Sequence, residues 1–107
     1  MRRTTQIELA LALAFCLTGA VGFAQSGGAA TYKAKCANCH GAAGMAETNV
    51  GKALKVRPVS DPTVKKLTLA EQIASTKNGE GKMPSFKDKL TDAEIKGSVE
   101  YFRTFIK

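Results

Sequence analysis

The chain has 107 residues, of which 44% are hydrophobic and 7% aromatic, and its formal net charge is +7. This length permits one domain and little more. The excess of basic residues is not accompanied by a motif that combines basic and aromatic residues, so no nucleic-acid partner is expected. The sequence shows neither a catalytic triad nor a paired-carboxylate site, and it does not predict an enzyme.

The first 24 residues have the layout of a secretory signal peptide. The basic pair Arg2-Arg3 precedes an uncharged apolar run over residues 9–23, and the small residue Ala24 closes that run. A retained membrane anchor is the alternative, but a span needs about 20 apolar residues, and Glu8 leaves this run shorter. We therefore expect cleavage near Ala24, a mature domain over residues 25–107, a periplasmic location and no permanent membrane insertion.

The expected mature domain is too small to be stabilised easily by apolar packing alone. Residues 25–107 keep 14 basic and 8 acidic residues, a formal charge of +6, because Arg2, Arg3 and Glu8 lie in the leader. Domains of this size are usually stabilised by a covalent cross-link or a bound group. A disulfide between Cys36 and Cys39 would close so short a loop that it restrains the unfolded chain weakly. Another group must complete the core.

The first expected helix runs from about Gly28 to Ala37. It places Gly28, Tyr32 and Cys36 on one face, at i, i+4 and i+8. Residues 41–60 are rich in glycine and lysine, and they are expected to form a loop with one helical turn near residues 51–54. Pro62 directly after Asp61 is typical of the start of another helix.

Two capping boxes predict the remaining helices. Thr68 and Glu71 open a helix that ends at Gly79, and Thr91 and Glu94 open the last one. The last helix is expected to turn one apolar stripe to the core and Gly97 to the opposite, solvated side. The residues of that stripe are Ile95, Val99, Phe102 and Ile106, with Phe105 beside it. No segment alternates with a period of two, so the predicted fold class is all-α, with about four helices.

Cys36-Ala37-Asn38-Cys39-His40 has the C-x-x-C-H spacing of c-type haem attachment. Two thiols about one helical turn apart can add to the vinyl groups along one edge of a porphyrin, and the next imidazole then projects toward the iron. A thioredoxin-like pair would need a preceding strand, and a zinc site would need four ligands. The sequence therefore predicts one covalent haem c held by Cys36 and Cys39, with His40 as an iron ligand.

The sixth iron ligand is expected to be a methionine, because His40 is the only histidine. Met45 follows His40 by five residues, too close to reach the opposite haem face easily. Met83 lies in the Gly79-Glu80-Gly81-Lys82-Met83-Pro84 loop, where glycines let the backbone approach the ring and proline stiffens the loop. A role as a gap-filler in the core is the alternative for Met83.

Together, the C-x-x-C-H motif and the Lys-Met-Pro-Ser-Phe loop before the last helix resemble class I monohaem cytochromes c. The whole expected mature chain is similar to the short bacterial carriers of the cytochrome c6, c553 and c551 kind. The resemblance implies thioethers at Cys36 and Cys39, a proximal ligand at His40 and a distal ligand at Met83. It also implies that the first and last helices cross at a small residue packed by aromatic side chains. Many members carry a proline soon after the haem motif, whereas the first proline here is Pro58.

The expected function is the transfer of single electrons between periplasmic or membrane-bound redox proteins by a monomeric carrier. A gas-binding or sensing module, a weak peroxidase, and a dedicated cytochrome subunit of a dehydrogenase or oxidase are the alternatives. Several lysines come from segments that should border the haem, and they predict an acidic docking face on the partner, although ordinary solvated lysines would give the same pattern. These residues are Lys33, Lys35, Lys52, Lys55, Lys82, Lys87 and Lys89.

Overall fold

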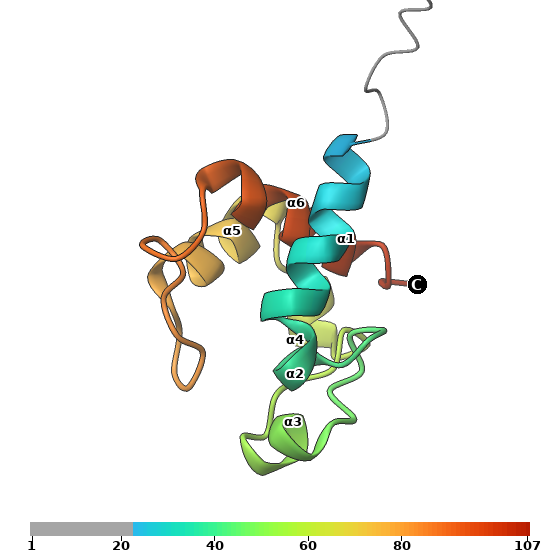
Figure 1. Cartoon of the computed structure of the whole chain (residues 1–107). Coiled ribbons are helices and arrows are strands. Elements are labelled where there is room, and N and C mark those ends of the chain that lie inside the picture. Colours follow the sequence, from blue (N-terminus) through green and yellow to red (C-terminus); the bar gives the residue numbers. More distant parts are fainter. Residues whose placement is uncertain (1–22) are drawn as a thin grey trace, which may run out of the picture.

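A computed structural model describes residues 23–107, which contain only helices and loops apart from an isolated bridge between Glu80 and Met83 (Figure 1). The all-α prediction is confirmed over this range. The expected signal peptide lies almost entirely outside it, at residues 1–22. The helices are α1 (Phe23–Lys35), α2 (Ala37–His40), α3 (Asn49–Ala53), α4 (Pro62–Lys65), α5 (Leu69–Asn78) and α6 (Asp92–Arg103).

Three of these helices begin where local signals predict a start. In α5 the Thr68 hydroxyl accepts a hydrogen bond from the Glu71 amide, and the Glu71 carboxylate accepts one from the Thr68 amide. Thr91 and Glu94 form the same box at α6. Asp61 caps α4. The expected turn in the loop is α3, whose first amides are capped by Thr48.

Three helix ends differ from the expectation. The sequence predicts that the first helix starts near Gly28, but residues 23–27 already belong to α1. The first helix is interrupted at Cys36, which has φ −116° and ψ −38°, so α2 is a separate four-residue segment. The last helix ends at Arg103, and Ile106 lies beyond it in a half-buried position instead of extending the helical stripe. Within residues 23–107 we find no helix with the length and apolar character needed to cross a bilayer.

The expectation that Gly97 faces solvent is wrong. Helix α6 packs against two neighbours, α1 on one side and α5 on another (Figure 1). Ile95 and Val99 join the core cluster with Phe86 and Leu90, whereas Gly97 meets the backbone of α1. A helix that contacts two partners buries two faces, and a face that is buried through a small residue is not visible in the pattern of large apolar residues.

The crossing of α1 and α6 brings two glycines together and depends on the absence of a side chain at Gly28. A Cβ atom on Gly28 would lie 2.5 Å from the Gly97 carbonyl oxygen, closer than atoms can approach. Above this contact, the Tyr32 ring lies 5.3 Å from the Tyr101 ring and 5.9 Å from the Phe105 ring. The implied crossing at a small residue among aromatic side chains therefore has glycine on both helices.

We expect Gly28→Ala to force α1 and α6 apart and to lower the unfolding free energy of the holoprotein by about 1–3 kcal/mol. Gly27→Ala is the matched control, because a Cβ there would meet nothing within 4 Å. That change should be neutral or should stabilise the helix by up to about 1 kcal/mol. Denaturant titration of both variants measures the difference, and equal stabilities would contradict the close crossing.

Candidate functional site

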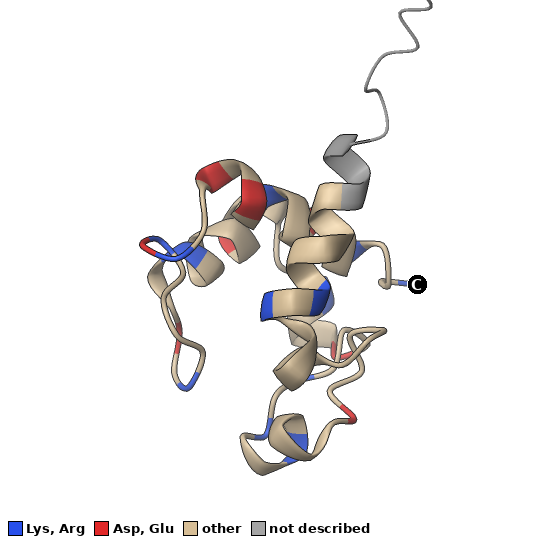
Figure 2. Ribbon diagram, viewed as in Figure 1, with Lys and Arg blue, Asp and Glu red and all other residues tan. Residues whose placement is uncertain are grey.

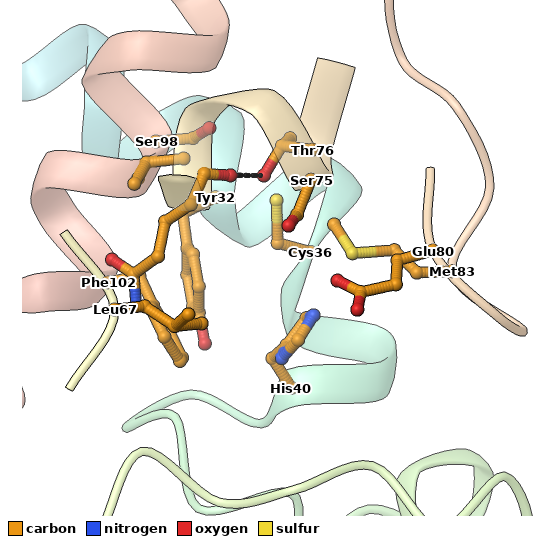
Figure 3. Close-up of a pocket in the computed structure, with 12 residues that line it drawn as sticks. Tyr32, Cys36, His40, Leu67, Ser75, Thr76, Glu80, Met83, Ser98 and Phe102 are labelled. Atoms are coloured by element: carbon orange, nitrogen blue, oxygen red, sulfur yellow. Dashed lines mark hydrogen bonds between the residues drawn. The ribbon is translucent and has the colours of Figure 1, made fainter. Parts of the chain in front are cut away.

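A cavity of about 150 Å³ lies between α1, α2, α5, α6 and the loop that carries Met83 (Figure 3). Apolar side chains supply much of its wall, including Leu67, Val99 and Phe102. Cys36, His40 and Met83 line this same cavity, although 43 residues separate His40 from Met83 in the sequence. The structure thus brings three of the four predicted site residues to one place.

The two remaining sulfur-bearing candidates lie elsewhere. Cys39 is half-buried in α2, one residue before His40, and it does not line the cavity. Met45 is 47% exposed and borders a different surface depression, with Val59 and Phe105. Of the two methionines in the described residues, only Met83 lines the cavity that His40 also lines.

The backbone around His40 is held by short-range hydrogen bonds. The His40 amide donates to the Cys36 carbonyl at 2.9 Å, and the Gly41 amide donates to the Ala37 carbonyl at 2.8 Å. Gly41 then leaves α2 with φ +82°, a conformation that favours glycine. Farther along the loop, the Ala46 amide donates to the His40 carbonyl at 2.8 Å. These bonds fix where the histidine side chain begins.

The His40 side chain is half-buried, in surroundings that suit a metal ligand. Burial lowers the pKa of this histidine, which favours the neutral form that binds metals. Its Nδ1 atom is buried without a hydrogen-bond partner among the described residues. Buried polar atoms without a partner are rare in proteins, and a bound group that reorients or ligates the ring would remove this cost. The ring packs edge-on against Phe102 at 5.4 Å.

The Met83 loop closes on itself through two backbone hydrogen bonds, and its far end is bonded back to α5. The Glu80 amide donates to the Met83 carbonyl at 3.1 Å, and the Met83 amide donates back to the Glu80 carbonyl at 2.9 Å. Gly79, at φ +79°, has no room for a side chain, because a Cβ there would lie 2.8 Å from the Ser85 amide nitrogen. The Ser85 hydroxyl donates to the Lys77 carbonyl at 2.7 Å. Met83 itself packs against the core cluster.

The cysteines do not resemble a redox pair. Cys36 and Cys39 are not joined in a disulfide. Burial raises the pKa of the Cys36 thiol, and a hydrogen bond with Ser98 only partly opposes this effect. A thiol that serves in disulfide exchange needs a lowered pKa. The Cys36 thiol therefore lacks the activation that disulfide exchange requires.

A polar network in the cavity wall was not anticipated from the sequence. The Arg103 guanidinium donates to the Leu67 carbonyl at 2.9 Å and to the Gln72 side-chain oxygen at 2.8 Å. The Gln72 amide group donates to the Val64 carbonyl at 3.5 Å. Arg103 thus ties α6 to the chain before α5. Gln72 and Thr76, four residues apart, are both buried on this face of α5, and because both are polar, no signal in the sequence indicates that the face points inward.

Comparison with known proteins agrees with this architecture. Residues 24–102 match the family model described as cytochrome C oxidase, cbb3-type, subunit III. Cytochrome c6 of Leptolyngbya boryana is 35% identical over 74 residues, which cover 69% of this chain and 84% of that protein. The c-type cytochrome KustC0563 has 33% sequence identity and a TM-score of 0.68, with 75% of this chain and 98% of that chain covered. Cytochrome c6C from Synechococcus sp. PCC 7002, at 23% identity and a TM-score of 0.59, has the same fold over 75% of this chain and 94% of that chain.

The fold and the shared cavity define a small haem protein of the all-α class. The chain belongs to the cytochrome c family, as a class I monohaem member. Its cofactor is one covalently bound haem c with iron, and its activity is electron transfer. The residues present fit this group, because a half-buried imidazole with a lowered pKa, a half-buried thiol and a thioether line a cavity whose wall is largely apolar.

We expect Arg103→Met to lower the unfolding free energy of the holoprotein by about 1–3 kcal/mol, because it leaves the buried Gln72 side chain short of a partner. Lys96→Met is the control. Lys96 is exposed and pairs with Glu100 only at 3.9 Å, so its loss should cost less than about 0.5 kcal/mol. Thermal or denaturant unfolding distinguishes the two, and equal effects would mean that the Arg103 network contributes little.

Proposed function

We propose that residues 25–107 form a soluble periplasmic carrier that moves single electrons between redox proteins and has no enzymatic activity of its own. The observation that carries this proposal is that His40 and Met83 line one cavity from different elements. The match to the family model begins at residue 24, which supports a domain that starts close to the predicted cleavage point.

In this proposal Cys36 and Cys39 are the thioether attachments, His40 is the proximal ligand and Met83 is the distal ligand. When bound, the haem supplies a one-electron couple between ferric and ferrous iron. His40 and Met83 would hold the iron, and apolar side chains such as Val99 and Phe102 would limit the access of water to the group. The anchoring of the Met83 loop supports a closed distal side, which does not favour gas binding or peroxidase activity.

A dedicated oxidase subunit is the second candidate function. It is favoured by one observation, the description of the matching family model as subunit III of a cbb3-type oxidase. A permanent subunit would co-purify with its oxidase at moderate salt, whereas a free carrier would be recovered as a monomer. Size-exclusion chromatography of the native protein from its own membranes and soluble fraction separates these two candidates.

The distribution of charge supports docking to an acidic partner. Lysines lie in the Met83 loop, in the last turn of α1 and in α3 (Figure 2). Acidic residues lie in the first turn of α6, at Asp92 and Glu94, and Glu80 lies in the Met83 loop together with Lys82 (Figure 2). A basic surface around the mouth of the cavity would attract a negatively charged partner and speed its encounter with the haem edge.

We expect Met83→Ala to abolish the weak red sulfur-to-iron absorption band of the ferric protein. The change should also open the iron to added ligands and lower the reduction potential, because thioether ligation favours ferrous iron. Met45→Leu is the control and should leave all three properties unchanged, since Met45 lies on another surface. Absorption spectra and redox titration measure these effects. Survival of the band in Met83→Ala, together with its loss in Met45→Leu, would reverse the assignment.

We expect Lys82→Glu to slow electron transfer to an acidic partner several-fold at low salt, with a smaller effect at high salt. Lys65→Glu makes the same charge change in α4, beside the depression that contains Met45, and should have a weaker effect. Stopped-flow rates over a range of ionic strengths test this difference. A rate that is independent of salt would mean that the lysines are only solvated surface residues.

A further inference from the structure

The side chain of Tyr32 reaches from α1 to the backbone beside the iron ligand. Its hydroxyl donates a buried hydrogen bond of 2.6 Å to the carbonyl of Gly41, the residue directly after His40. Tyr32 is 1% exposed, so water does not compete for this bond. The Gly44 amide also donates to the Gly41 carbonyl, but at 3.3 Å. Tyr32 therefore provides the shorter of the two bonds that hold this carbonyl.

The ring of Tyr32 is also linked to His40 by packing, through the ring of Phe102. It stacks on Phe102, with ring centroids 6.2 Å apart and an interplanar angle of 26°, and Phe102 lies edge-on to the imidazole. A phenylalanine could make these ring contacts equally well. The hydroxyl makes a contact that packing does not require, and its function can therefore be separated from that of the ring.

We propose that the Tyr32 hydroxyl is a positioning group for His40, which it holds in place through the Gly41 peptide. This inference rests on the proposed role of His40 as an iron ligand. Without the hydroxyl, the Gly41 carbonyl would lose its short buried bond, and water or local motion would have to compensate. Water that entered to satisfy this carbonyl would make the proximal side more polar, and more polar surroundings favour the ferric state. The hydroxyl is therefore expected to keep the reduction potential high.

The test compares Tyr32→Phe with Tyr101→Phe in the haem-loaded protein. Both changes remove one phenolic oxygen from the same aromatic cluster, but we find no hydrogen bond of the Tyr101 hydroxyl within the described residues. In ferrous Tyr32→Phe, the amides of His40, Gly41 and Ala46 should exchange about tenfold faster than in the unmodified protein. In ferric Tyr32→Phe, the proton resonances of His40 that the iron shifts should move, and the potential should fall. Tyr101→Phe should match the unmodified protein in each measurement.

Each outcome decides the proposal. The proposal is supported if the amides near His40 exchange faster and the reduction potential falls in Tyr32→Phe but not in Tyr101→Phe. Unchanged His40 resonances and potential in Tyr32→Phe, or a uniform loss of protection across the fold, would overturn it and leave Tyr32 with a packing role. If the unmodified protein lacks iron-shifted His40 resonances, the ligand assignment itself fails.

A measurement on the unmodified protein covers the case in which Tyr32→Phe does not fold. The Tyr32 hydroxyl proton should exchange slowly enough with water to be observed by NMR, and it should lie close to the Gly41 backbone. Rapid exchange of this proton would overturn the proposal without any variant.

Discussion

The setting of the iron ligand depends on how closely α1 and α6 approach each other. Gly28 and Gly97 meet backbone to backbone, and a single methyl group on Gly28 would not fit. Because the helices lie this close, Tyr32 of α1 reaches the Phe102 ring of α6, and Phe102 in turn meets His40. The contact between Gly28 and Gly97 thus influences the packing around His40, although His40 belongs to neither helix.

The cavity combines an apolar lining with a polar frame. Leu67, Val99 and Phe102 face the interior, whereas Arg103 and Gln72 join the surrounding segments by hydrogen bonds. This arrangement joins the segments of the wall by hydrogen bonds between polar groups, and Glu80 is the one acidic residue among the described residues that line the cavity. Low polarity and fixed hydrogen bonds are two of the means by which a protein sets the potential of a haem.

Features encoded by neighbouring residues were predictable from the sequence. The two capping boxes need only a threonine and a glutamate three residues apart, and both form. The C-x-x-C-H motif and the Met83 loop carry their chemistry in a few consecutive residues, and the family match agrees with the haem that they indicate. What remained hidden depends on distant partners. The role of Gly97 is evident only from its contact with Gly28. Arg103 bonds to groups 31 and 36 residues away.

The pairing of α1 with α6 also has a consequence for the order in which the chain can fold. Gly28 and Gly97 are 69 positions apart, so the helix that precedes the cysteines cannot find its partner until almost the whole domain has been synthesised. Closing a loop of this length costs conformational entropy before any contact compensates for it. During that interval the thiols of Cys36 and Cys39 belong to an open chain. An attachment apparatus would therefore meet an accessible pentapeptide, and burial of its histidine would follow as the last helix docks.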